Sequence, residues 1–236
     1  MQIHYQDDWL IAVEKPSGML AVIGRGPQNA LNLATDVQTA WPGALPVHRL
    51  DQGTSGVMLF ARTAEMHRQM NALFAARRVE KRYVAVVAGR PAASAGCIEL
   101  PLMKDWPNRP RQKVDRALGK PSTTYWWVWG MEVENGAALE ELPKVREEFH
   151  AVGHEACANP QGEEVTTRLE LRPVTGRTHQ LRVHLAEIGH PIIGDELYAP
   201  AKIAVASARL LLHAAELAFV HPANGKEVRI RSAVPF

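Results

Sequence analysis

An aspartate occupies the most distinctive position in this chain. Residues 48–56 read His-Arg-Leu-Asp-Gln-Gly-Thr-Ser-Gly, which places the Asp51 carboxylate between an arginine and a run of small residues. A carboxylate in such a loop is open to a substrate and, when ionised, can act as a nucleophile or a base. Taken alone, an aspartate before a small-residue turn more often caps that turn through its side-chain oxygen. The motif by itself leaves both roles open.

Two other stretches could supply partners for that carboxylate. Residues 176–184, Gly-Arg-Thr-His-Gln-Leu-Arg-Val-His, form an arginine-rich cluster, and residues 81–85 read Lys-Arg-Tyr-Val-Ala. A cation such as Arg177 near Asp51 would favour the ionised carboxylate. The flat ring of Tyr83 could stack on a nucleobase. Local sequence alone also allows a surface arginine and a core tyrosine.

The composition of the surrounding segments predicts the elements that position these residues. Strands are expected at 9–13, 57–61, 83–88, 123–129, 167–171, 210–212, 216–220 and 228–231, and helices at 28–40, 64–77 and 178–188. The side chains of the first helix that are available for burial are Leu31, Leu33, Ala34 and Val37. Thr178 is the expected N-cap of the helix at 178–188. Prolines in residues 101–121 predict an ordered loop or arm. The order lacks a βαβ repeat, which indicates an α+β fold with a large mixed or antiparallel sheet, flanked by helices and loops.

The charge is unevenly distributed. Residues 132–164 hold nine glutamates against one lysine and one arginine, which gives this segment a net charge of −7. Because the whole chain has a net charge of +2, the remaining residues together carry +9. Residues 62–82 and 104–120 each contain six lysines or arginines against two acidic residues. A solvated mixed surface explains any single run. Two basic runs beside one acidic segment make a nucleic-acid footprint plausible.

Several other classes of protein are disfavoured. Cys97 and Cys157 lack metal-binding or disulfide-framework spacing, and no signal peptide or membrane span is evident, so a cytoplasmic protein is expected. His179, His184 and His190 match no zinc motif and are better explained as hydrogen-bonded structural histidines, so no metal site is expected. A glycosidase would need a second carboxylate, which the cluster around Arg177 does not offer.

Together these motifs resemble the pseudouridine synthases of the RluA family. The family pattern H-R-L-D-x-x-T-S-G matches residues 48–56, G-R-[ST]-H-Q matches residues 176–180, and K-x-Y-x-A matches residues 81–85. The resemblance extends from Asp8 to the C-terminus and is closest to the dual-specificity enzymes of the family. It implies an aspartate that starts detachment of uracil from its ribose, so that the base can rotate and reattach through carbon.

The resemblance assigns roles to residues of this chain. It implies Asp51 as the catalytic carboxylate, Arg177 as its electrostatic partner and Tyr83 as the residue against the target base. Arg49, Thr54, His179 and Arg182 are expected to bind the substrate.

The expected reaction converts uridine to pseudouridine in 23S ribosomal RNA and/or a tRNA anticodon stem-loop, without a cofactor. We expect a monomer with one catalytic domain spanning residues 1–236 and no N-terminal S4 RNA-binding domain. Two departures from the family stand out: a longer acidic segment at 134–166, expected to be a surface insertion, and the pair Gln52-Gly53. A non-catalytic RNA-binding module is the alternative reading.

Overall fold

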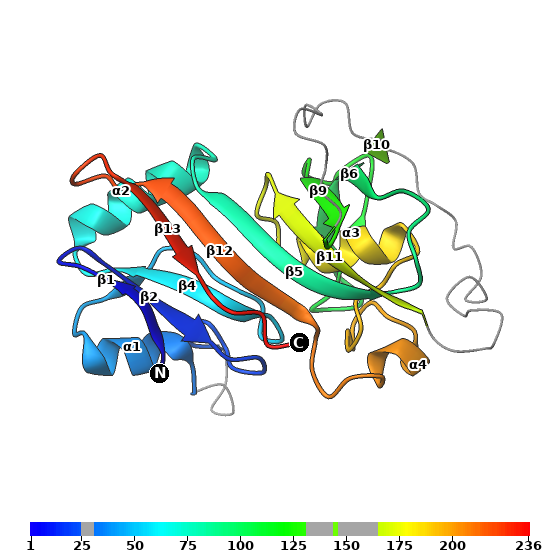
Figure 1. Ribbon diagram of the computed structural model, residues 1–236, viewed down its shortest axis with the longest axis horizontal. Helices are drawn as coiled ribbons and strands as arrows, with labels where there is room; N and C mark the ends of the chain where they lie inside the picture. The colour runs from blue at the N-terminus through cyan, green and yellow to red at the C-terminus, as the bar shows by residue number, and fades with distance from the viewer. Residues whose placement is uncertain (25–30, 131–143, 146–164) are drawn as a thin grey trace. The chain divides into compact units, whose positions relative to one another are not determined.

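The computed structural model describes residues 1–24, 31–130, 144–145 and 165–236 (Figure 1). The chain divides into two compact units, the first made of Met1–Tyr83 with His213–Phe236 and the second of Val84–Leu212. The predicted acidic insertion at 134–166 lies almost entirely outside the described residues. No helix in the described ranges has the length and apolar character to cross a membrane.

The first unit is a mixed sheet with two helices. Its elements are β1 (Ile3–Gln6), β2 (Leu10–Lys15), α1 (Leu33–Ala40), β3 (Leu45–Pro46), β4 (Ser55–Ala61), α2 (Ala64–Ala75), the start of β5 (Glu80–Ala88), β12 (Leu212–Val220) from His213 onward, and β13 (Glu227–Arg231). The strand order is β1-β2-β4-β12, with β13 beside β12 and β3 beside β4. Strands β4 and β12 are parallel, whereas β2 and β4 are antiparallel.

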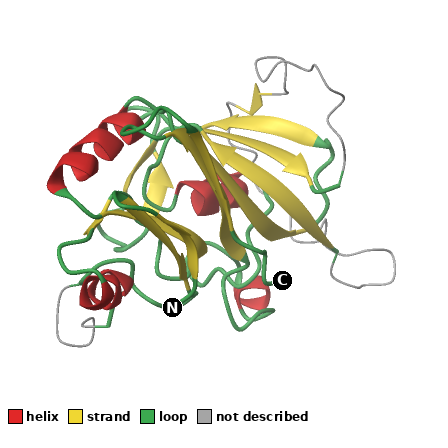
Figure 2. Cartoon of the chain, turned by 60° about the vertical axis from the view of Figure 1, so that its left-hand side comes forward, coloured by secondary structure: helices red, strands yellow, loops and turns green. Residues whose placement is uncertain are grey.

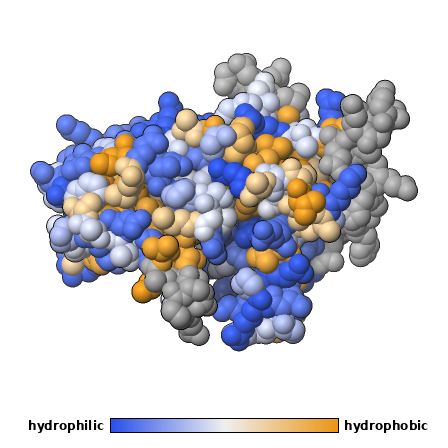
Figure 3. Space-filling model, turned by 90° about the horizontal axis from the view of Figure 1, so that it is seen from below, coloured by the Kyte–Doolittle hydropathy of each residue, from blue (hydrophilic) through white to orange (hydrophobic). Residues whose placement is uncertain are grey.

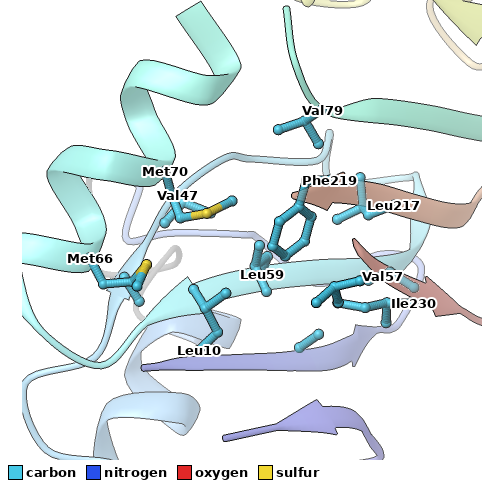
Figure 4. Packing of buried hydrophobic residues seen from close by; sticks show 13 residues of the cluster. Leu10, Val47, Val57, Leu59, Met66, Met70, Val79, Leu217, Phe219 and Ile230 are labelled. Atoms are coloured by element: carbon cyan, nitrogen blue, oxygen red, sulfur yellow. The ribbon is translucent and has the colours of Figure 1, made fainter. Parts of the chain in front are cut away.

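Strand β4 is buried on both faces, which explains its continuous apolar run. Val57, Leu59 and Ala61 pack with Met66 and Met70 of α2 in one core cluster (Figure 4). The alternate residues Met58 and Phe60 pack on the other face, in a cluster that includes Leu33 and Val37 of α1. Each fully buried side chain of this kind contributes about 1.5–3 kcal/mol. The strand that follows the Asp51 loop is therefore firmly anchored.

The second unit is also mostly strand (Figure 2). Its elements are the end of β5, β6 (Ala95–Glu99), β7 (Leu102–Lys104), β8 (Gln112–Val114), β9 (Thr123–Val128), β10 (Lys144–Val145), β11 (Thr166–Pro173), α3 (Gln180–Glu187) and α4 (Ala201–Ala204). The strand order is β5-β11-β9-β6-β10, and β7 and β8 form a separate antiparallel pair. The predicted α+β class with a large mixed sheet is confirmed.

Several local expectations were wrong. Helix α1 begins at Leu33, after the Asn32 side chain caps the backbone N–H of Thr35, and Leu31 is 82% exposed instead of buried. Residues 210–212 and 216–220 are not two strands, because one strand runs from Leu212 to Val220. The arm at 101–121 is ordered as expected but contains β7 and β8. Cys97 is a buried residue of β6.

Candidate functional site

Asp51 lies in the loop between β3 and β4, residues 48–54, here called the Asp51 loop. The side chain is partly buried, and the backbone N–H of Thr54 donates to the Asp51 carbonyl at 3.1 Å. The neighbouring Arg49 is exposed, whereas Thr54 is buried. Asp51 and Arg49 thus lie where a substrate can reach them. Thr54 shapes the turn beneath, and its predicted substrate contact stays a prediction.

A buried lysine holds the main chain of this loop. The Lys15 side chain is 0% exposed, and its ammonium donates to the carbonyls of Pro16, Gln52 and Thr54 at 2.8–2.9 Å. All three ammonium donors are therefore used, which offsets the cost of burying the charge. Sequence reasoning missed this residue, although the Lys-Pro-Ser-Gly run directly after a strand was a signal of a special turn.

The turn after Lys15 adds a second set of contacts to the same loop. The Ser17 hydroxyl donates to the Gly53 carbonyl at 2.6 Å, and the Gly18 N–H donates to the Gln52 carbonyl at 2.9 Å. The Gln52 side-chain amide in turn donates to the Gly18 carbonyl at 3.0 Å. The variable pair Gln52-Gly53 thus has a structural role in joining two loops.

His48 anchors the start of the loop. Its Nε2 accepts the backbone N–H of Leu59 at 3.0 Å, and its ring stacks on Phe74 with centroids 5.2 Å apart. Burial, followed by the charge of Lys81, lowers the pKa of His48 to about 3. The imidazole is therefore neutral near pH 7, as its acceptor role requires.

The end of the motif is fixed by close packing of β4 against β12. Gly56 has φ +117°, and a Cβ there would lie 2.3 Å from the Ala214 carbonyl oxygen. Beside it, Ser55 bonds His213 Nδ1 at 2.8 Å, and His213 Nε2 bonds the Ser232 hydroxyl at 3.0 Å. Since Ser232 donates onward to a carboxylate oxygen of Glu14, it accepts from His213 Nε2.

Tyr83 and Asp51 are brought together within the first unit. The Tyr83 ring is partly buried at the end of this unit, and burial, followed by the negative charge of Asp51, raises the pKa of its phenol. The phenol therefore stays neutral and remains a proton donor at physiological pH. Tyr83 thus lies close enough to Asp51 to be influenced by its charge, and the predicted roles of the two residues stay predictions.

Arg177 lies in the second unit, in the turn formed by residues 175–180, here called the Arg177 turn. Its side chain is exposed, and its Nε donates to the Pro121 carbonyl at 3.4 Å. Asp51 and Arg177 belong to different units, so their pairing stays a prediction.

Gln180 fixes this turn through all of its hydrogen-bonding groups. It is 3% exposed, and its Oε1 accepts the Thr175 hydroxyl at 2.6 Å and the Arg177 N–H at 3.0 Å. Its Nε2 donates to the Thr123 carbonyl and the Thr124 hydroxyl, each at 3.0 Å. The glutamine of the G-R-T-H-Q motif thus positions the arginine three residues earlier, a role that sequence reasoning missed.

His179, and not Thr178, occupies the N-cap position of α3. Its φ of 53° is left-handed, and its side chain makes no capping hydrogen bond, so the expected Thr178 cap was wrong. The His179 Nδ1 instead bonds the Tyr198 hydroxyl at 2.7 Å. A non-glycine residue in this conformation is costly and is held there by its surroundings.

Arg182 is committed to a buried ion pair. Its Nε and one terminal nitrogen donate to the two carboxylate oxygens of Asp195 at 2.8 and 2.6 Å, a bidentate geometry. Its guanidinium carbon lies 5.2 Å from the centroid of the Tyr198 ring. The Tyr198 ring near Arg182 carries the hydroxyl that bonds His179, and the expected substrate contact of Arg182 stays a prediction.

The three histidines considered for a metal each have a hydrogen-bonded place in the fold. His179 bonds Tyr198, and His190 bonds the Ala88 carbonyl at 3.0 Å. His184 is buried between the Thr124 hydroxyl and the Leu100 carbonyl. No cluster of three or more potential metal ligands occurs in the described ranges. The expected hydrogen bonds of these histidines are present, and the expectation of no metal site stays a prediction.

Comparison with known proteins adds independent findings. Residues 9–187 match the family model described as RNA pseudouridylate synthase. The dual-specificity RNA pseudouridine synthase RluA of Escherichia coli strain K12 is 39% identical over 234 residues, covering 99% of this chain and 93% of the relative. RluA of Vibrio vulnificus strain CMCP6 is 42% identical over 221 residues, covering 94% and 78%. The structure of human RNA Pseudouridylate Synthase Domain Containing 1 is similar with a TM-score of 0.72 and 25% identity, covering 100% of this chain and 84% of that one.

Proposed function

The chain belongs to the RNA pseudouridylate synthase family, whose members are isomerases, and from this premise we propose that it converts specific uridines in 23S ribosomal RNA and/or a tRNA anticodon stem-loop. The observation that carries the proposal is the pairing of Asp51, in the H-R-L-D-x-x-T-S-G motif, with Tyr83 of the K-x-Y-x-A motif. The dual-specificity relatives support both RNA classes as substrates. The same proposal includes a cytoplasmic monomer, one catalytic domain and no cofactor.

Asp51 and Tyr83 have different roles at the target nucleotide. The ionised carboxylate starts cleavage of the bond between ribose C1′ and uracil N1, the base rotates, and C1′ bonds to C5. The proton on C5 is then removed and N1 ends protonated, so the product is an isomer of uridine. Tyr83 stacks on the base, and its neutral phenol is available for proton transfer. Stacking of about 1–3 kcal/mol partly offsets the few kcal/mol needed to extrude the nucleotide.

Arg177 supplies positive charge to the Asp51 carboxylate in this proposal. Gln180 supports that role because it fixes the main chain on which Arg177 is carried. Arg49 holds a phosphate or fills the space left by the extruded base, with Thr54, His179 and Arg182 completing substrate binding. Arg177→Ala should lower kcat, and Arg177→Lys should restore part of the loss if charge is what the residue provides. Equal rates for all three proteins would remove Arg177 from the mechanism.

The first experiment incubates the purified protein with unmodified tRNA and with a 23S ribosomal RNA fragment, without added metal or nucleotide. Pseudouridine is mapped by mass spectrometry after chemical tagging. Product in either RNA is expected, and product in both supports dual specificity. A folded protein that binds both RNAs and makes no product would instead favour the non-catalytic binding module.

Asp51→Asn separates chemistry from binding in the same assay. It should lower turnover by roughly 10³-fold or more while RNA affinity stays within a few-fold, because phosphate contacts dominate binding. Asp36→Asn, which changes an exposed carboxylate on α1, is the matched control and should retain wild-type turnover. Wild-type turnover in Asp51→Asn would overturn the assignment of the carboxylate.

A further inference from the structure

Residues 101–120, here called the basic hairpin, carry the most concentrated positive charge among the described residues of the second unit. Six lysines and arginines stand against two aspartates, a net +4, and all six cations are exposed: Lys104, Arg109, Arg111, Lys113, Arg116 and Lys120. Asp115 accepts the backbone N–H groups of Ala117 and Leu118. Asp105 accepts the side-chain amide of Asn108. The aspartates thus organise turns and leave an excess of cations facing solvent.

An exposed tryptophan lies among these cations. Trp106 is 56% exposed, with the Arg109 guanidinium carbon 4.1 Å and the Lys104 ammonium 4.9 Å from its ring centroid. On the one face of the molecule drawn in Figure 3, hydrophilic and hydrophobic residues are interspersed. A guanidinium stacked on an indole is held flat, and both planar groups are surfaces on which nucleobases stack.

Main-chain hydrogen bonds and close packing hold the basic hairpin in its conformation. Its tip is closed by main-chain hydrogen bonds that link Asp105, Asn108 and Arg111. At its base, a Cβ on Gly119 would lie 2.2 Å from the Asp115 carbonyl oxygen, so only glycine allows this close approach. Groups held in place in advance lose less entropy on binding.

The Tyr198 hydroxyl connects the basic hairpin to the Arg177 turn. The Gln112 N–H donates to the Tyr198 hydroxyl at 2.8 Å, and that hydroxyl bonds His179 Nδ1 at 2.7 Å. All of these residues lie within the second unit. The hairpin is thus positioned with respect to the turn that carries Arg177.

We propose that the basic hairpin is an RNA-binding arm that holds the substrate away from the target nucleotide. Lys104, Arg109 and Arg111 contact phosphates, and an unpaired base stacks on the Arg109–Trp106 pair. The inference rests on the proposed function, since it takes RNA as the substrate, and it adds a binding subsite that acts on affinity. RNA fits this surface because planar cation–aromatic stacking and excess positive charge occur together.

The test measures dissociation constants of an unmodified anticodon stem-loop RNA by fluorescence anisotropy at several salt concentrations. Trp106→Ala should raise Kd roughly 10-fold. Lys104→Ala/Arg109→Ala should raise Kd and reduce the slope of log K against log salt by about 1–2. Lys226→Ala, which removes an exposed cation in the β12–β13 turn, should leave both quantities unchanged. Circular dichroism establishes that each variant is folded.

A second RNA isolates the stacking component. With a blunt duplex of the same length, Trp106→Ala should lose little affinity because no unpaired base is offered. An equal loss on the duplex would overturn the stacking of an unpaired base. Unchanged Kd and salt slope for every hairpin variant on the stem-loop would overturn the arm itself.

Kinetics distinguish failure of this inference from failure of the proposed function. The hairpin variants should raise KM about as much as Kd. The wild-type protein could bind RNA through the hairpin and yet make no pseudouridine. That result would overturn the proposed function and support the RNA-binding arm. Pseudouridine formation with normal KM in all hairpin variants would support the proposed function and overturn the RNA-binding arm.

Discussion

The Asp51 loop of the first unit and the Arg177 turn of the second unit each carry one charged candidate residue, and they are stabilised by different groups. In the Asp51 loop the fixed groups are main-chain carbonyls, which are bound by Lys15 at the end of β2 and by Ser17 in the turn after it. In the Arg177 turn the fixing group is the side chain of Gln180, from the helix that follows. The first arrangement depends on one buried charge and the second on a neutral network. Each can therefore be disrupted separately.

Lys15→Met should have the largest effect. The substitution retains most of the apolar stem but leaves the carbonyls of Pro16, Gln52 and Thr54 without their shared donor. We expect a loss of about 3–5 kcal/mol in the free energy of unfolding, together with loss of turnover. Urea denaturation measures the first and pseudouridine formation the second. The control Lys226→Met changes an exposed lysine and should shift stability by less than about 0.5 kcal/mol. Similar stabilities of the two variants would contradict the role of Lys15.

Gln180→Leu is the corresponding change in the Arg177 turn. It keeps the approximate volume but leaves the Arg177 N–H and the Thr123 carbonyl without the amide. We expect a loss of about 2–4 kcal/mol in stability and a drop in kcat, because the Arg177 main chain is no longer fixed. Gln6→Leu, at the exposed end of β1, is the control for adding an apolar side chain. A variant with normal kcat would show that Gln180 supports only the fold.

The same contrast explains what the sequence could and could not predict. The strand at 57–61 and the helix at 64–77 were recognisable because burial imposes an apolar pattern on neighbouring residues. Lys15 was not, since a lysine is normally exposed and its acceptors at Gln52 and Thr54 lie 37 and 39 residues further along. Tyr198 bonds His179 across 19 residues. The motifs identified the candidate site residues, whereas the residues that support them are fixed by tertiary contacts.

A pH series tests one buried histidine in each unit. Burial lowers the pKa of His184 to about 4, and burial with the Lys81 charge lowers the pKa of His48 to about 3. Above pH 6.5 both imidazoles are neutral in the folded and unfolded chains, so stability is unaffected. As pH falls below 6.5, only the unfolded chain gains these protons, and stability falls until the folded pKa is reached. At pH 5 the loss should be about 2 kcal/mol per histidine.

Urea denaturation at pH 7.5 and pH 5.0 measures this loss. His48→Gln and His184→Gln should each reduce the difference in unfolding free energy between the two pH values, whatever their stability at pH 7.5. If either variant keeps the wild-type difference in unfolding free energy between the two pH values, the pKa of that histidine is not lowered in the folded protein.

Tyr198→Phe is the smallest change and tests the connection between the Arg177 turn and the basic hairpin. It removes one oxygen, so His179 and the Gln112 N–H lose their shared partner while the ring over Arg182 is kept. We expect about 1 kcal/mol less stability. The informative measurement is a double-mutant cycle with Arg109→Ala, read as RNA affinity. If the hydroxyl positions the hairpin, Arg109→Ala should cost less affinity in the Tyr198→Phe protein than in the wild type. Losses that add to within about 0.3–0.5 kcal/mol would show that the two elements act independently.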